Sequence, residues 1–315
     1  MPPAEPTLAA LPNPALRYLI AMRPPFLSVT LAACLIGLAT AFFAGLPMHA
    51  ATATLTVVFA LVAHAGVNVL NDYYDALNGT DAANVDRVFP FTGGSRIIQN
   101  GVLSARQMAV FGAALFAVVI AAGLWLTAAS APGLVWIGAA GLLIGWMYSA
   151  PPLRLNSRGL GEICVWTGFA LIALGADFVQ RGAFSTLPVV AASGYALLVT
   201  NILYINQFPD RRADLIAGKR HWVARLDPGI ARWGYVALGS AAYACVLIGI
   251  LMRVLPWLAL VTLLPAFLSI AAARDLLRYP TRPPMLAPAI EKTIAAANLH
   301  GILMAAALTA ARLLA

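Results

Sequence analysis

Nine long apolar runs constrain the fold of this chain more than any other feature of its sequence. Most are close to the roughly 20 residues that a helix needs to cross the hydrocarbon core of a bilayer. Hydrophobic residues make up 61% of the chain and charged residues only 10%. In lipid, every backbone polar group must be satisfied internally, and a helix achieves this within one segment. We therefore expect an all-α, polytopic membrane protein.

The runs predict a single nine-helix transmembrane domain over residues 17–315. Residues 1–16 are rich in Pro and Ala and lack a basic amino-terminal region, so we expect a disordered tail rather than a signal peptide. The predicted spans cover residues 26–46, 51–70, 108–126, 133–147, 160–176, 187–205, 235–252, 256–273 and 293–314.

The basic residues indicate membrane topology rather than nucleic-acid binding. The formal charge is +8, but the arginines and lysines lie between apolar runs instead of gathering on one soluble face. If the N-terminus is cytoplasmic, 17 of the 20 basic residues fall on the cytoplasmic side, and only Arg181, Arg253 and Arg312 do not. By the positive-inside rule this asymmetry supports both the span count and that orientation.

The second apolar run ends in an acidic segment. Asn68, Asp72 and Asp75 follow one another at i, i+4 and i+7, so all three share one face if the helix continues through them. A charge inside the bilayer would cost roughly 2.5 to 3.5 kcal/mol. Such a cluster at the cytoplasmic end of a span therefore suggests a functional site.

A second acidic segment repeats this arrangement at the end of the sixth run. Asn206, Asp210 and Asp214 are spaced at i, i+4 and i+8. Pro209 removes a backbone donor and crowds the carbonyl of Ile205, so we expect a kink or a fresh helix start there. Both segments are predicted to face the cytoplasm.

The two segments together predict a cation site. They contain seven of the twelve acidic residues, which would repel one another unless cations lie between them. Carboxylate and amide oxygens without His or Cys suit Mg²⁺, which usually shares its coordination shell with substrate phosphates. A phosphorylated ligand is therefore expected. The seven acidic residues are Asp72, Asp75, Asp81, Asp86, Asp210, Asp214 and Asp227, and the loops also offer Arg87, Arg96, Arg154, Lys219, Arg220 and the backbone N–H groups of Gly93, Gly94 and Ser95.

Three other interpretations of the polar residues stay open. A lone acidic pair at a helix end is usually a cap or a solvated charge, although two Asn-headed copies on one side disfavour that explanation here. Repeated polar motifs also occur in secondary transporters, whose sites usually lie nearer mid-membrane. Glu162 stands at a predicted helix start, where a carboxylate favours the helix dipole.

The motifs resemble those of the UbiA superfamily of intramembrane aromatic prenyltransferases. NDYYDALNGTD at 71–81 is similar to its first aspartate-rich motif, and DRRAD at 210–214 is similar to its second. The resemblance implies nine transmembrane helices around a central cavity. The 1,4-dihydroxy-2-naphthoate polyprenyltransferase branch is the most similar, on the strength of GGSRII at 93–98, YSAPPLRL at 148–155, GLGE at 159–162 and AGKR at 217–220.

Two departures from the family patterns bear on the acceptor. The 4-hydroxybenzoate branch has an acid where this chain has Gly79, and Asp81 stands two residues later. NQFPD at 206–210 differs from the NN-x-R-D wording of the naphthoate enzymes. The expected acceptor is 1,4-dihydroxy-2-naphthoate, in menaquinone synthesis, with 4-hydroxybenzoate and homogentisate as alternatives.

The resemblance also implies roles for individual residues. Two Mg²⁺ ions would hold the diphosphate of an isoprenyl diphosphate, while an aromatic ring attacks the allylic carbon and pyrophosphate leaves. Tyr148 would face the allylic cation, or else anchor the chain at the membrane interface. The expected setting is the bacterial cytoplasmic membrane, with the oligomeric state open. The implied ligands are Asn68, Asp72, Asp75 and Asp81 for one ion and Asp210 and Asp214 for the other, with Asn206, Arg96, Arg154, Lys219 and Arg220 on the substrate.

Overall fold

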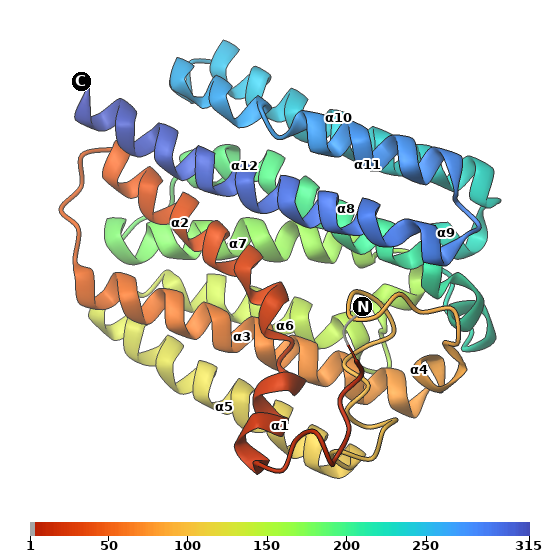
Figure 1. Cartoon of the computed structure of the whole chain (residues 1–315). Coiled ribbons are helices and arrows are strands. Elements are labelled where there is room, and N and C mark those ends of the chain that lie inside the picture. The colour runs from red at the N-terminus through yellow and green to blue at the C-terminus, as the bar shows by residue number, and fades with distance from the viewer. Residues whose placement is uncertain (1–3) are drawn as a thin grey trace.

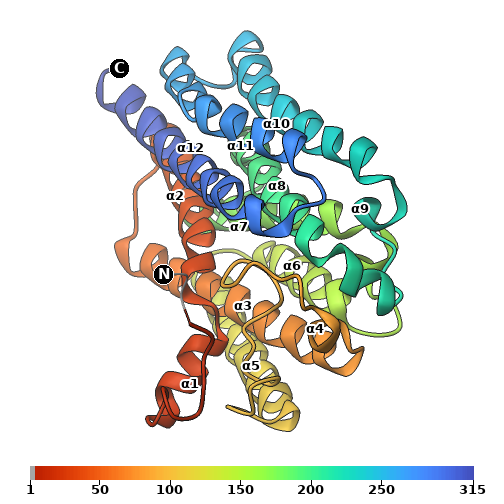
Figure 2. The same ribbon diagram turned by 45° about the vertical axis from the view of Figure 1, so that its right-hand side comes forward.

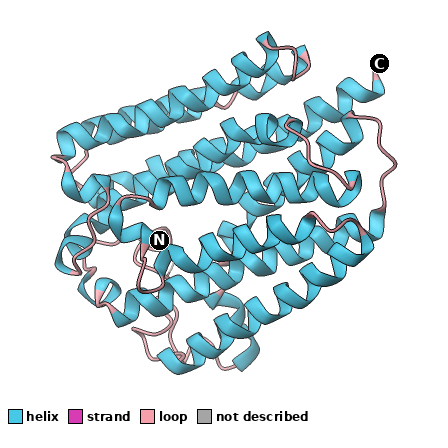
Figure 3. Cartoon of the chain, turned by 180° about the vertical axis from the view of Figure 1, so that it is seen from behind, coloured by secondary structure: helices cyan, strands magenta, loops and turns pink. Residues whose placement is uncertain are grey.

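The computed structural model describes residues 4–315, which form a bundle of long helices lying side by side (Figure 1). Within that range every regular element is helical (Figure 3), as the sequence predicted. The α-helices are α1 Pro14–Ala21, α2 Ser28–Phe43, α3 Ala50–Leu77, α4 Thr80–Ala83, α5 Ala105–Ala129, α6 Leu134–Ser149, α7 Gly161–Arg181, α8 Leu187–Ile216, α9 Trp222–Arg225, α10 Pro228–Leu251, α11 Ala266–Arg278 and α12 Ala287–Leu313. Short 3₁₀ helices are η1 Pro24–Leu27, η2 Leu155–Arg158, η3 Trp257–Leu263 and η4 Pro283–Leu286.

Most of the long helices match the length and composition of membrane spans. Within residues 4–315, eight helices are long and apolar enough to cross a bilayer, counting η1 with α2, η3 with α11 and η4 with α12. The remaining predicted span, 133–147, corresponds to α6, which is apolar but only 16 residues long. The chain is thus an all-helical integral membrane protein. The crossing by α6 and the cytoplasmic N-terminus stay predictions.

The two helices that carry the acidic segments are longer than their apolar runs. Helix α3 has 28 residues and α8 has 30, so both continue through the acidic residues. The predicted fresh helix start at Pro209 is wrong, because α8 runs from Leu187 to Ile216 with Pro209 inside it and buried. Neighbouring helices can compensate for a missing proline hydrogen bond in a membrane bundle. Asn206, Asp210 and Asp214 therefore share one helix.

Small residues hold the centre of the bundle together. Helices α7 and α8 lie in the middle, between α10–α12 on one side and α3 and α5 on the other (Figure 2). A Cβ added to Gly37 in α2 would lie 2.1 Å from the carbonyl oxygen of Ala173 in α7, and one on Gly194 in α8 would lie 2.5 Å from that of Ala242 in α10. Such close backbone approach maximises van der Waals contact, which drives helix association in lipid.

The amino-terminal segment contacts the bundle, in contrast to the expected disordered tail. Residues 1–3 lie outside the described residues, and α1 begins already at Pro14. The carboxylate of Glu5 accepts hydrogen bonds from Arg87 (2.6 Å) and Asn100 (3.1 Å). Leu11 is 5% exposed and packs in a small apolar cluster with Ile97. Partial burial raises the pKa of Glu5, but these hydrogen bonds outweigh it and hold the pKa below its usual value.

We expect Gly37→Ala to destabilise the bundle by about 3 kcal/mol, the upper end of overpacking costs, because its Cβ meets backbone that cannot turn away. Thermal unfolding in detergent measures the effect. Gly138→Ala is the matched control, because a Cβ there meets nothing within 4 Å, and it should be neutral or stabilising by up to about 1 kcal/mol. Equal melting temperatures of the two variants would contradict the close α2–α7 contact.

Candidate active site

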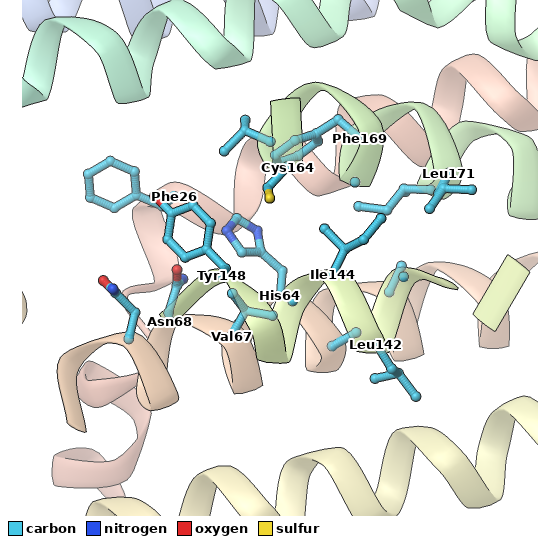
Figure 4. Close-up of a pocket in the computed structure, with 18 of the residues that line it drawn as sticks. Phe26, His64, Val67, Asn68, Leu142, Ile144, Tyr148, Cys164, Phe169 and Leu171 are labelled. Atoms are coloured by element: carbon cyan, nitrogen blue, oxygen red, sulfur yellow. The ribbon is translucent and has the colours of Figure 1, made fainter. Parts of the chain in front are cut away.

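A cavity of about 810 Å³ lies between α3, α5, α6, α7 and α8. Most of its wall is apolar, with side chains such as Phe59, Ile120 and Leu142. Figure 4 shows Phe26, His64, Tyr148 and Phe169 around its inner part, with Asn68 beside them. At one end the lining changes to carboxylates and amides from the two acidic segments. The cavity is therefore an apolar chamber with one strongly polar end.

The first acidic segment is covered by the loop that follows α4. Asp72, Asp75 and Asp81 are all nearly buried, with exposed fractions of 3%, 9% and 3%. A Cβ on Gly94 would lie 2.8 Å from Oδ2 of Asp81 and 3.1 Å from Oδ1 of Asp72, so only glycine allows the loop to approach both carboxylates. The backbone N–H of Ser95, expected to meet phosphate, instead donates to Oδ2 of Asp72 at 3.0 Å.

The second acidic segment occupies the last turns of α8. Oδ2 of Asp214 lies 2.9 Å from Nε2 of His221, which is 2% exposed. Oδ1 of Asp210 accepts a hydrogen bond from the amide of Asn84 at 2.5 Å. Asn84 ends the short helix α4, so this contact links the second segment to the chain that carries Asp81. The two acidic segments thus face one another across the polar end.

Lys219 lies between the two segments. Its Nζ is 2.9 Å from Oδ1 of Asp75 and 3.2 Å from Oδ1 of Asp214, and the residue is only 8% exposed. Burial lowers the pKa of Lys219, but the two carboxylates raise it more, and the net shift is upward. The lysine is therefore a permanent cation at neutral pH. It offsets the repulsion between carboxylates that α3 and α8 bring together.

The residues around Lys219 could also bind metal cations, in addition to the ammonium group of the lysine. At this end of the cavity, three buried acceptor oxygens have no hydrogen-bond donor among the described residues: Oδ1 of Asp72, Asn84 and Asn206. Burial, followed by the charges of Asp75 and Asp72, raises the pKa of Asp81 well above its usual value. Unpaired oxygen ligands in an excess of negative charge suit a hard divalent ion. No three acidic, His or Cys side chains of the described residues already form a metal-binding group, so the shell would need oxygens from a ligand.

The structure brings most of the predicted site residues to one cavity. Arg96 instead lies behind the site, where it donates to the backbone oxygen of Asp81 and is 3.7 Å from Glu5. Two of the seven carboxylates lie elsewhere, since Asp86 pairs with Arg212 and Asp227 caps α10. The predicted residues that line the cavity are Asn68, Asp75, Asp81, Tyr148, Asn206, Asp210, Asp214 and Lys219, while Asp72 adjoins Asp81.

Two predicted substrate-binding arginines do not reach the cavity lining. Arg154 and Arg220 line a separate pocket with Arg158 and Arg225. The sequence gave no indication of this separate pocket. Arg154 belongs to the turn after α6, far from Arg220 in the chain, and Arg220 directly follows Lys219, which lines the cavity. Adjacent residues in an extended turn point in different directions, so Lys219 and Arg220 serve different pockets.

The cavity also contains functional groups that sequence reasoning missed. Arg23, with its NH1 3.9 Å from Oδ1 of Asp72, lines the polar end together with Asn84 and His221. Nothing in the sequence around Arg23 indicates this contact, because it depends on the packing of α1 and η1 against α3. His221 follows the AGKR stretch directly and was within reach of a motif-based search.

A buried Glu–Gln pair lies in the wall between α7 and α8. Glu162 is in the first turn of α7, as the sequence predicted. In addition, its Oε1 accepts a hydrogen bond from the amide of Gln207 at 2.9 Å. Oε2 of Glu162 and Oε1 of Gln207 are both buried without a partner among the described residues, and Gln207 lines the cavity. Gln207 thus brings a buried acceptor without a donor to the cavity wall, and Glu162, with a second such oxygen, holds its amide from behind.

The site is an apolar chamber within a membrane bundle, and two facing carboxylate segments and a buried lysine close one end of it. This architecture is typical of an intramembrane enzyme and suits a ligand with an apolar tail and an anionic head. Residues 29–289 match the model of the UbiA prenyltransferase family. The chain therefore belongs to that family and is a prenyltransferase.

Individual relatives agree with this assignment. The chain is 29% identical to a 1,4-dihydroxy-2-naphthoate octaprenyltransferase of Mycobacterium leprae, over 94% of this chain and 97% of that protein. It is 28% identical to a 2-carboxy-1,4-naphthoquinone phytyltransferase of Synechocystis, over 95% of each chain. A UbiA homologue from Archaeoglobus fulgidus, solved bound to DMAPP and Mg²⁺, is 18% identical, with a TM-score of 0.58 over 92% of this chain and 99% of that one. The structural likeness shows the same fold.

We expect Lys219→Gln to lower the free energy of unfolding by about 3–5 kcal/mol in EDTA, because it leaves the buried Asp75 without a cationic partner and Asp214 with His221 alone. Added Mg²⁺ should restore more of the melting temperature in this variant than in the wild type, since a divalent ion can replace the lost charge. Lys292→Gln, which breaks a half-exposed pair with Asp275, is the control and should cost less than about 1 kcal/mol. An equal response to Mg²⁺ in both variants would argue against a cation site beside Lys219.

Proposed function

We propose that the protein transfers a polyprenyl group from an isoprenyl diphosphate to 1,4-dihydroxy-2-naphthoate with the help of Mg²⁺, releasing pyrophosphate. The observation that carries this proposal is the pair of carboxylate segments that face one another across Lys219 at the polar end of an apolar cavity. The naphthoate-specific relatives support the acceptor class. The proposed place of action is the cytoplasmic face of the bacterial inner membrane, as the distribution of basic residues predicts.

Two metal ions are proposed to bind between the acidic segments. Asn68, Asp72, Asp75 and Asp81 would hold one ion, and Asp210 and Asp214 the other, with diphosphate oxygens completing each shell. Bound there, the ions would stabilise the negative charge that develops on the leaving pyrophosphate. The Archaeoglobus homologue, which was solved with DMAPP and Mg²⁺, supports this arrangement by analogy of fold.

The chain's own residues would hold the donor and protect the reacting carbon. Lys219 and Arg23 place permanent positive charge beside the diphosphate position. As the carbon–oxygen bond breaks, its electron pair leaves with pyrophosphate and the allylic carbon becomes cation-like. The rings of Tyr148 and Phe26 line the cavity and would stabilise that cation through their faces. The apolar wall excludes water, which would otherwise capture the cation.

The Glu162–Gln207 pair is proposed to receive the hydroxyl groups of the aromatic acceptor. Both side chains offer a buried oxygen that lacks a donor, and a phenolic hydroxyl is such a donor. A hydrogen bond from the ring hydroxyl would also increase the electron density of the ring that attacks the allylic carbon. The ring carbon that forms the new bond would then lose its hydrogen as a proton, or its carboxylate as carbon dioxide, and so restore the aromatic ring. Acceptors such as 4-hydroxybenzoate or homogentisate carry hydroxyls too and could make the same hydrogen bond. Activity measured with a panel of acceptors therefore distinguishes them.

We expect Asp72→Ala, Asp210→Ala and EDTA each to abolish pyrophosphate release from a labelled polyprenyl diphosphate, because each removes part of the cation site. Asp86→Ala is the matched control: its carboxylate is half-exposed, pairs with Arg212 and should not affect activity. Full activity in either cavity variant would contradict the two-metal assignment. Solute transport into liposomes without any pyrophosphate release would favour a transporter instead.

We expect Gln207→Leu to reduce kcat/KM for the aromatic acceptor by about 10- to 100-fold, because a buried hydrogen bond to the acceptor is lost and Glu162 loses its donor. The KM for the polyprenyl diphosphate should stay within about twofold. Steady-state kinetics with each substrate varied in turn separates the two effects. A rise in the diphosphate KM alone would show that Gln207 serves the donor rather than the acceptor.

A further inference from the structure

A second pocket, of about 280 Å³, lies behind the wall that carries Lys219. Its lining includes four exposed arginines, Arg154, Arg158, Arg220 and Arg225, and no acidic residue. The volume is several times the roughly 30 Å³ that a water molecule occupies in the liquid, so there is room for a group of phosphate or diphosphate size. The pocket is separate from the carboxylate-lined cavity.

The arginines of this pocket carry unbalanced charge. Among residues 4–315 none of the four pairs with a carboxylate, whereas Arg87, Arg181 and Arg212 each do. Arg158 donates to the backbone oxygen of Pro152 (2.8 Å) and Arg225 to that of Arg158 (2.9 Å). The guanidinium groups of Arg154 and Arg220 make no hydrogen bond within the described chain. Since each guanidinium has five N–H donors, most of the donors in the pocket are free.

Backbone contacts hold the pocket in shape. The N–H of Arg220 donates to the backbone oxygen of Ser157 at 2.7 Å, which joins the segment after α8 to η2. Arg154 has a positive φ of 44°, a strained conformation for a residue with a side chain. Gly159, next to Arg225, has a positive φ of 82°, which favours glycine. These contacts fix the backbone from which the four arginines line the pocket.

The pocket shares a wall with the active site. Lys219 reaches Asp75 and Asp214, while its neighbours Gly218 and Arg220 line the second pocket. Asn78 lines the same pocket and donates to Oδ1 of Asp75 at 3.2 Å. Two exposed apolar side chains are near its lining residues: Ile216 directly precedes Ala217, and the ring of Trp222 lies 5.9 Å from the guanidinium of Arg225. An anion bound there would thus lie next to the apolar surface of the bundle and directly behind the diphosphate site.

We infer that this four-arginine pocket is a second anion site, which binds a phosphate-bearing group without a metal ion. Guanidinium groups recognise phosphate oxygens with paired hydrogen bonds, and the absence of lining carboxylates removes any need for a bridging cation. The bound group is either free pyrophosphate or the headgroup of an anionic phospholipid, which share this chemistry.

The test measures anion binding by the full-length protein in EDTA, where the carboxylate-lined cavity cannot use metal. One arm is equilibrium dialysis with labelled pyrophosphate, and the other is native mass spectrometry with phosphatidylglycerol against phosphatidylcholine. The wild type should bind one of the two anions at a single site. Arg154→Gln/Arg220→Gln should weaken that binding at least about tenfold, through loss of charge-assisted hydrogen bonds. Arg106→Gln, at an exposed arginine of α5 without an ion pair, should leave it within about twofold.

The two arms show which anion binds, and the variants show whether it binds in the arginine pocket. Binding of pyrophosphate identifies the free anion, and selective retention of phosphatidylglycerol identifies a lipid headgroup. The proposal is overturned if neither probe binds to the wild type, if the double variant binds as well as the wild type, or if Asp210→Asn in the cavity abolishes binding. Should the double variant unfold, Arg225→Gln provides the same comparison.

Discussion

The ammonium group of Lys219 between Asp75 and Asp214 is the interaction on which the rest of the site depends. Helices α3 and α8 bring acidic segments to the same end of the bundle, where burial makes their repulsion costly. One permanent cation between them lets the two helix ends pack closely. The same placement fixes the turn after α8, so that the cavity and the arginine pocket lie on its two sides.

The chamber separates the two parts of a prenyl donor by physical character. Its wall is mostly apolar, as the proposed binding of a hydrocarbon tail requires, and its polar end concentrates the charged and hydrogen-bonding groups. The membrane bundle makes this division possible, because small residues such as Gly37 and Gly194 hold the central helices in close backbone contact. The outward-facing surface is meanwhile apolar, with exposed side chains such as Trp136 and Phe267. The same distribution of polar and apolar residues therefore places the bundle in the membrane and the charged groups at one end of the cavity.

Much of this arrangement was predictable, and the failures have identifiable causes. The apolar runs located the long helices, and the two Asn-headed repeats located the carboxylates of the cavity. Proline stereochemistry suggested a kink or a fresh helix start at Pro209, yet α8 continues through it, as neighbouring helices in a membrane bundle allow. Arg96 and Arg154 were expected at the diphosphate because basic residues in the same loops appear equivalent in a sequence. In the structure Arg96 is taken up by Glu5 and Asp81, and Arg154 by a different pocket.

The sequence by itself determined the class of protein and the position of the acidic segments, and it predicted the cation site, since these depend on local composition and on spacing along one helix. Only the tertiary structure decided which charges meet. Arg23, Asn84 and Gln207 reach the site from α1–η1, α4 and α8 through packing that no local pattern encodes. Whether Lys219 or Arg220 faces the carboxylates depends on the direction of a single turn, and that direction is fixed by contacts with η2, a segment about 60 residues away in the chain.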